Sequence, residues 1–174
     1  MMIKSVSDNQ NEILENILTL TNRSSFDADI SYGNGNFYKR VSKPSLRYDI
    51  DPQSSDVIQA CSTSLPLVDC SLSSVVFDPP FLTYVRNGRS GNGDMVMSKR
   101  YGGYWRYDEL EKHYKETITE VHRILQPKGI FVFKCQDIIH NHKMHSTHIN
   151  VVNWCENKFR LNDLFILTAK HRMD

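Results

Sequence analysis

The stretch Val75-Val76-Phe77-Asp78-Pro79-Pro80-Phe81 decides which fold this sequence predicts. An uninterrupted apolar run is typical of a strand that is covered on both faces of a parallel sheet. The two prolines after Asp78 fix the backbone torsions and lack N–H donors, so the strand must end there. Carbonyl oxygens at that strand end are then free to accept hydrogen bonds from a ligand.

Outward from this strand, short apolar runs alternate with segments of helical periodicity. The pattern predicts strands at residues 26–31, 46–50, 75–78, 130–133 and 164–168, and helices at residues 9–21, 54–60, 108–125 and 147–157. Residues 61–73 are rich in Ser, Thr and Pro, and are expected to hold at most a degenerate strand. The alternation predicts an α/β fold, with a doubly wound, mainly parallel sheet and helices on both faces.

Length and composition bound the class of protein. A chain of 174 residues is long enough for one well-buried domain, which we expect to span residues 1–174. It has no run approaching the roughly 18 to 20 apolar residues that cross a bilayer, and its first ten residues are polar, so a cytoplasmic protein without a membrane partner is expected. The net charge of +1 does not by itself indicate a nucleic-acid binder.

The four cysteines, Cys61, Cys70, Cys135 and Cys155, lie far apart and form no C-x-x-C pair. This spacing favours reduced thiols over a zinc knuckle or a disulfide framework.

The residues Asp78, Pro79, Pro80 and Phe81 are the candidate catalytic group. An amino nitrogen on an aromatic ring must become more tetrahedral before it can attack an electrophilic methyl group. Hydrogen bonds from its two protons to the Asp78 carboxylate and the Pro79 carbonyl would favour that geometry, and Phe81 could stack on the ring. For the Asp-Pro-Pro tripeptide alone, a plain turn after a strand is the alternative interpretation.

The stretch Asp29-Ile30-Ser31-Tyr32-Gly33-Asn34-Gly35 covers the end of the strand at residues 26–31 and the glycine-containing loop after it, and Asp49-Ile50 ends the next strand. Glycines let a cofactor approach the backbone, and an acid about 20 residues further on can accept hydrogen bonds from ribose hydroxyls, for which Asp49 is the candidate. The third glycine of G-x-G-x-x-G is absent, which favours a nucleoside cofactor without pyrophosphate. A plain turn is again the alternative for the G-x-G alone.

In this order, the glycine loop, the acidic strand end, Asp-Pro-Pro-Phe and Leu125-Gln126-Pro127-Lys128-Gly129-Ile130 resemble the amino methyltransferases that modify adenine N6 or cytosine N4 in DNA. The similarity covers about residues 26–168 and rests mainly on the Pro-Pro motif. It implies a Rossmann-like methyltransferase fold and S-adenosylmethionine as cofactor. It also implies that the target amino group lies at Asp78, Pro79 and Phe81, and it assigns a cofactor pocket to Asp29, Ser31, Gly33, Gly35, Asp49 and Ile50.

Two departures from the family pattern matter. The loop reads Ser-Tyr-Gly-Asn-Gly where the family has Phe-x-Gly-x-Gly, so a different aromatic residue would pack on the cofactor. No separate target-recognition domain fits in this chain, and a partner chain or a second copy could supply one.

The segment at residues 82–107 interleaves cations with aromatic rings, a combination suited to phosphates and unpaired bases. The candidate substrate-binding residues are Arg86, Arg89, Lys99, Arg100, Tyr104, Trp105 and Arg106. The alternative is a solvated surface loop.

The histidines His140, His142, His145 and His148 are interpreted as part of a polar loop and not as a metal site, because methyl transfer needs no metal. The expected substrate is a nucleobase, with adenine N6 in DNA ahead of guanine N2 in RNA, and a protein glutamine is a further alternative. A non-catalytic, nucleic-acid-binding or regulatory subunit with the same fold is the hypothesis from another class.

Overall fold

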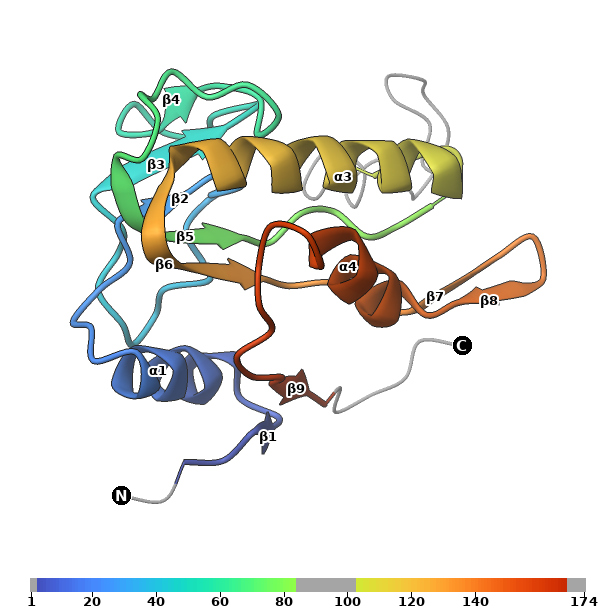
Figure 1. The fold of residues 1–174 in the computed structure, drawn as a ribbon, viewed down its shortest axis with the longest axis horizontal. Coiled ribbons are helices and arrows are strands. Elements are labelled where there is room, and N and C mark those ends of the chain that lie inside the picture. The colour runs from blue at the N-terminus through green and yellow to red at the C-terminus, as the bar shows by residue number, and fades with distance from the viewer. Residues whose placement is uncertain (1–2, 84–102, 169–174) are drawn as a thin grey trace.

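The computed structural model describes residues 3–83 and 103–168. Its helices and strands, in chain order, are β1 (Val6–Ser7), α1 (Gln10–Leu20), β2 (Ala28–Asp29), β3 (Leu46–Asp49), β4 (Ile58–Gln59), β5 (Leu72–Phe77), α3 (Tyr107–Ile124), β6 (Leu125–Phe133), β7 (Ile138–His140), β8 (Lys143–His145), α4 (Thr147–Cys155) and β9 (Ile166–Leu167) (Figure 1).

The centre of the molecule is a parallel sheet of five strands in the order β4-β3-β2-β5-β6. Counted along the chain, these strands stand in the order 3-2-1-4-5, and the direction of progression reverses between β2 and β5. Ala28 of β2 pairs with Leu46 on one side and with Val75 on the other. The predicted α/β class and parallel sheet are therefore confirmed, and the strand order is compatible with a Rossmann-like fold.

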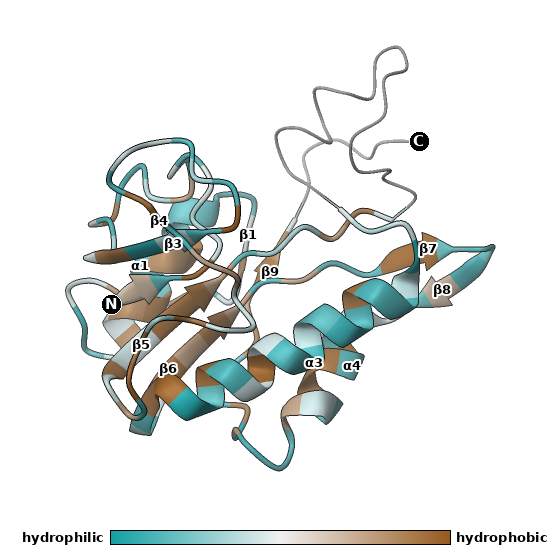
Figure 2. Ribbon diagram, turned by 90° about the horizontal axis from the view of Figure 1, so that it is seen from above, coloured by the Kyte–Doolittle hydropathy of each residue, from teal (hydrophilic) through white to brown (hydrophobic). Residues whose placement is uncertain are grey.

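Successive side chains of β5 point to opposite faces of the sheet, and a helix packs against each face. Val76 packs in one apolar cluster with Leu14 and Leu18 of α1. Val75 and Phe77 point the other way, into a larger cluster built mainly with α3. Figure 2 shows the hydrophobic colouring gathered on β5 and β6, and the hydrophilic colouring on the outer side of α3.

The predicted helices at residues 9–21, 108–125 and 147–157 are confirmed, as α1, α3 and α4. The helix α1 begins after Asn9, whose Oδ1 accepts a hydrogen bond from the Asn11 N–H at 3.0 Å. The helix α3 begins after Arg106, and the Glu109 carboxylate accepts a hydrogen bond from the Trp105 N–H at 3.0 Å. No helix in the described part of the chain has the length and apolar character needed to cross a membrane.

The predicted helix at residues 54–60 is wrong. Ile58 and Gln59 instead form β4, which pairs with the end of β3. The Ser54 hydroxyl donates to the Asp56 carboxylate, and the Val57 N–H reaches the Ser54 carbonyl at 3.2 Å, so a single turn forms and does not continue. Short polar side chains that bond locally compete with helix formation in this way.

Two further expectations need correction. The strand expected at residues 164–168 is present as β9, but it pairs with β1 in a separate two-stranded sheet. The expected polar loop with the histidines contains a hairpin, β7 and β8, in which Ile139 pairs with Met144. Asn141 and His142 turn between these strands at φ values of 51° and 57°, as a tight hairpin turn requires.

Candidate active site

The Asp-Pro-Pro-Phe motif lies at the carboxyl end of β5, and it is held by two neighbouring segments. The Asp78 N–H donates to the Ser31 hydroxyl at 2.7 Å, which joins the motif to the loop after β2. The Tyr114 hydroxyl of α3 donates to the Pro80 carbonyl at 2.9 Å. Pro79 is buried, whereas Phe81 is partly exposed. The motif is therefore fixed between the two strand ends and α3.

The Asp78 carboxylate pairs with the ammonium of Lys134, which stands at 3.0 Å from Oδ1 and 3.1 Å from Oδ2. Burial raises the pKa of Asp78, and the charge and hydrogen bond of Lys134 act in the opposite direction. Asp78 is thus a half-buried acid, and Lys134 is its one close counterion among the residues that the structure describes.

Asp29, predicted as a cofactor residue, is 1% exposed and faces its own loop. Its carboxylate accepts hydrogen bonds from the Tyr38 hydroxyl at 2.6 Å, the Ser31 N–H at 2.8 Å and the Ser31 hydroxyl at 3.3 Å. Burial raises the pKa of Asp29 to about 7, although the hydrogen bonds from Tyr38 and Ser31 lower it, and the nearby Asp78 raises it further. Asp29 therefore organises the loop from inside the protein.

The two glycines of the loop have different surroundings. Gly33 has a φ of +55°, and a Cβ built on it would meet nothing within 4 Å. Gly35 has a φ of +72°, and a Cβ there would lie 2.5 Å from the Tyr32 hydroxyl oxygen. The Tyr32 ring stacks on Tyr38 with centroids 5.9 Å apart, and its buried hydroxyl makes no hydrogen bond within the described residues. The open approach to this backbone is therefore at Gly33.

Asp49 ends β3 and holds the glycine loop through one carboxylate oxygen. Its Oδ2 accepts a hydrogen bond from the Gly33 N–H at 2.7 Å, and its Oδ1 accepts one from the Asp51 N–H at 2.9 Å. Each carboxylate oxygen can accept more than one hydrogen bond. The next residue, Ile50, is 69% exposed, so an apolar side chain stands at the surface beside the loop.

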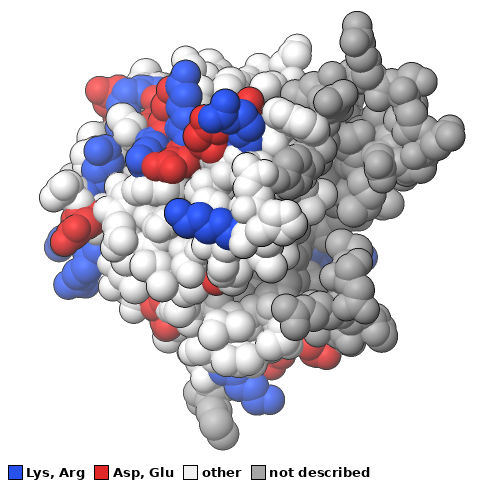
Figure 3. Space-filling view, turned by 90° about the vertical axis from the view of Figure 1, so that its right-hand side faces the viewer, with Lys and Arg blue, Asp and Glu red and all other residues white. Residues whose placement is uncertain are grey.

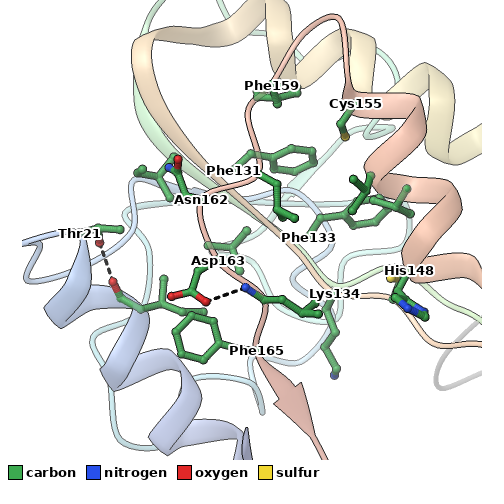
Figure 4. Close-up of a pocket in the computed structure, with 18 of the residues that line it drawn as sticks. Thr21, Phe131, Phe133, Lys134, His148, Cys155, Phe159, Asn162, Asp163 and Phe165 are labelled. Atoms are coloured by element: carbon green, nitrogen blue, oxygen red, sulfur yellow. Dashed lines mark hydrogen bonds between the residues drawn. The ribbon is translucent and has the colours of Figure 1, made fainter. Parts of the chain in front are cut away.

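A hollow of about 2450 Å³ runs along the free edge of β6, between α1, α4 and residues 158–168 (Figure 4). Phe37, Phe81 and Lys134 are among its lining residues, so the site at Asp78 opens toward it. Phe131, Phe133 and Lys134 of the β6 segment line one wall. The site is thus accessible from the side of the sheet that carries α1.

Four of the candidate substrate residues, Arg86, Arg89, Lys99 and Arg100, lie outside the described residues. Of the other three, Tyr104 has its hydroxyl 2.5 Å from His113 Nδ1, and this hydrogen bond anchors it on α3. Trp105 is 40% exposed, and Arg106 forms an exposed ion pair with Asp108 at 2.8 Å. Figure 3 shows one face of the molecule, on which Lys and Arg side chains gather in the upper part together with Asp and Glu side chains.

The histidine segment contains a carboxylate–imidazole contact. His148 Nδ1 lies 2.7 Å from Asp137 Oδ1, and His145 stacks on Tyr107 with centroids 3.7 Å apart. Within residues 3–83 and 103–168, no three histidine, cysteine or acidic side chains come together as a metal site would require.

Several functional candidates were not identified from the sequence, above all Lys134 and Tyr38. Lys134 directly follows the apolar run of β6, as Asp78 directly follows that of β5. The carboxyl ends of parallel strands meet at one edge of a sheet. The position of Lys134 and Asp78 directly after their strands was therefore a sequence signal that the two side chains lie close together.

Comparison of the chain with protein-family models and with curated proteins finds no match.

Proposed function

We propose that this protein is an S-adenosylmethionine-dependent methyltransferase that modifies an exocyclic amino group of a nucleobase, with adenine N6 in DNA favoured. The observation that carries the proposal is the hydrogen bond of 2.7 Å from the Asp78 N–H to the Ser31 hydroxyl. It joins the two segments that the sequence assigns to catalysis and to cofactor binding. They meet where the strand order reverses, which is where ligands bind in doubly wound, Rossmann-like sheets.

The loop after β2 fits a nucleoside cofactor in three respects. Gly33 leaves space for close approach, Asp49 keeps acceptor capacity for ribose hydroxyls, and the exposed Ile50 can cover an adenine ring. The buried, unpaired Tyr32 hydroxyl adds a polar atom beside the loop. When bound there, S-adenosylmethionine would supply an electrophilic methyl group on a charged sulfonium.

The residues around Asp78 would orient the target amino group. The Asp78 carboxylate and the Pro79 carbonyl accept hydrogen bonds from its two protons, so the nitrogen lone pair is directed away from the ring plane. Phe81, partly exposed beside the hollow, stacks on the base. As the nitrogen gains the methyl group it loses one of the two protons, and Asp78 is the nearest base that can take it.

A base in a duplex reaches such a site only when it leaves the stack. The exposed Trp105 and Arg106, which follow the motif in the chain, are the described residues that we assign to holding the nucleic acid. A partner chain or a second copy would supply any further recognition of the target sequence.

The test is to incubate the protein with methyl-labelled cofactor and, separately, with DNA, RNA and protein, and to measure which polymer gains label. Label in DNA as N6-methyladenine is the expected result. Asp78→Ala should lower the rate by about 100-fold or more, with cofactor binding by calorimetry retained. Asp69→Ala, which removes a carboxylate that is 74% exposed and lies outside the hollow, serves as the matched control.

Label in RNA or protein would replace the favoured substrate with one of those polymers. Absence of label together with absence of cofactor binding would sink the enzyme hypothesis and leave a non-catalytic subunit.

A further inference from the structure

Lys134 is placed beside Asp78 by the pairing of the two strands that precede them. Phe77 of β5 is opposite Phe133 of β6, and the Lys134 N–H donates to the Phe77 carbonyl at 2.9 Å. The backbone pairing thus continues one residue past the strands. It brings the two side chains to the same edge of the sheet, where the ammonium reaches both oxygens of the Asp78 carboxylate.

The Lys134 ammonium also contacts α1 and the segment that follows β2. It donates to Gln10 Oε1 at 3.1 Å, at the first residue of α1, and it lies 5.0 Å from the centroid of the Phe37 ring in the glycine loop. The ammonium thus donates hydrogen bonds to Asp78 Oδ2 and Gln10 Oε1, and it forms an ion pair with Asp78 Oδ1. The side chain is therefore held in one orientation by three separate segments.

The charged groups around Asp78 show why its contact with Lys134 is important. The titratable groups that interact with Asp78 are Asp29 from β2, Tyr38 from the glycine loop, Tyr114 from α3 and Lys134 from β6. Lys134 is the one cation in that set of described residues. The buried Asp29 and the half-buried Asp78 thus interact with each other, and Lys134 is the cation that pairs with Asp78.

We propose that Lys134 is a positioning residue that keeps Asp78 ionised and fixes the orientation of its carboxylate for the target amino group. The proposal rests on the methyltransferase function. A protonated Asp78 would present an O–H donor to an amino group that is itself a donor, and would lose half of its acceptor capacity. Removal of Lys134 leaves Asp78 next to Asp29 without a counterion, which favours protonation.

The experiment measures the ionisation of Asp78 directly, by ¹³C NMR titration of the side-chain carboxyl carbon in protein labelled at aspartate. The Asp78 signal is assigned from its absence in Asp78→Asn. Lys134→Met should raise the titration midpoint of Asp78 by about one pH unit or more, and Lys134→Arg should restore it. Lys112→Met, which removes a 76% exposed lysine, is the matched control and should leave the midpoint unchanged.

Methyl transfer provides the second readout. The acid limb of the rate profile of Lys134→Met should move to higher pH by the same amount as the NMR midpoint, and Lys134→Arg should return it. If Lys134→Met does not fold, Lys134→Gln, whose amide can still donate to Asp78, takes its place with a smaller expected shift.

An Asp78 midpoint that is the same in the wild type and in Lys134→Met overturns the proposal. A shifted midpoint in a protein that methylates none of DNA, RNA and protein upholds the control of Asp78 by Lys134, and it removes the proposed function instead.

Discussion

The Asp29 carboxyl group lies inside the protein, and its pKa is raised from 3.8 to about 7. Between these values the folded state holds a proton that the unfolded state releases, so stability falls as the pH rises through this window. From about pH 5 to pH 7, the free energy of unfolding should fall by roughly 2 to 3 kcal/mol on account of this group. Chemical denaturation at a series of pH values measures that slope.

Asp29→Asn should flatten the slope, because the amide oxygen can still accept the Ser31 N–H and no longer titrates. The control Asp163→Asn removes an exposed carboxyl group and should keep the wild-type slope. A wild-type slope in Asp29→Asn would mean that another group causes the dependence.

The acids of the site could be predicted from the sequence because each lies at the end of a strand: Asp29 and Asp49 end β2 and β3, and Asp78 directly follows the apolar end of β5. The side chains that contact these acids could not be predicted from the sequence. The contact between Lys134 and Asp78 depends on the register of β5 against β6, and Tyr38 reaches Asp29 only because the loop folds back. Such long-range pairing leaves no periodic signal in the chain.

The segment of residues 61–70 has little regular structure of its own, and Arg123 near the end of α3 holds it in place. The guanidinium donates to the Leu65 carbonyl at 3.2 Å, to the Leu67 carbonyl at 2.7 Å and to the Asp69 carboxylate at 2.7 Å. We expect Arg123→Ala to lower the free energy of unfolding by about 2 kcal/mol.

Urea denaturation measures this loss. Arg106→Ala removes an ion pair whose two side chains are 64% and 62% exposed, so it should change stability by less than about 0.5 kcal/mol. Equal effects of the two substitutions would show that Arg123 is not a structural anchor.

A partly buried chain of hydrogen bonds ties the end of the predicted substrate segment to α3. Tyr104 bonds to His113 Nδ1 at 2.5 Å, and His113 Nε2 lies 2.8 Å from the Ser62 hydroxyl, which lies 2.9 Å from that of Thr117. Tyr104→Phe leaves one buried nitrogen without its partner, so it should cost about 1 to 2 kcal/mol of stability.

Thermal unfolding of Tyr104→Phe, Ser62→Ala and the double variant tests the chain. If the side chains form one network, the double variant should lose less stability than the sum of the losses of the two single variants. Strict additivity would show that the four side chains act separately.

At the scale of elements, helical periodicity was a sufficient guide to α1 and α3, since each buries one apolar stripe. The helix α4 was also predicted, although its buried residues are Thr147 and Val151 and its Ile149 is exposed. The short strands β4, β7 and β8 were not predicted. The strand β4 is exposed and is defined by its pairing with β3, and the hairpin of β7 and β8 depends on a turn without glycine.

The sheet and the paired strands β1 and β9 differ in how firmly they are built into the molecule. The strands β2, β5 and β6 are covered by apolar clusters on both faces, whereas Val6, Ile166 and Leu167 in β1 and β9 are 53%, 49% and 41% exposed. Local opening is easiest where few apolar contacts protect the backbone. We therefore expect the N–H of Ile166, bonded to the Ser5 carbonyl, to exchange about 100-fold faster than that of Ile30, bonded to the Val76 carbonyl.

Hydrogen exchange followed by NMR measures both amides in one experiment, and it also separates the site from the hollow beside it. We expect Asp78, Ser31 and Lys134 to lie in the slowly exchanging part of the molecule, and residues 158–168, which line the hollow, to exchange faster. Cofactor bound at the glycine loop should slow exchange at the Gly33 N–H without slowing that of Ile166. Equal slowing at both positions would mean that the ligand closes the hollow as a whole, and that its site is not confined to the carboxyl ends of β2 and β3.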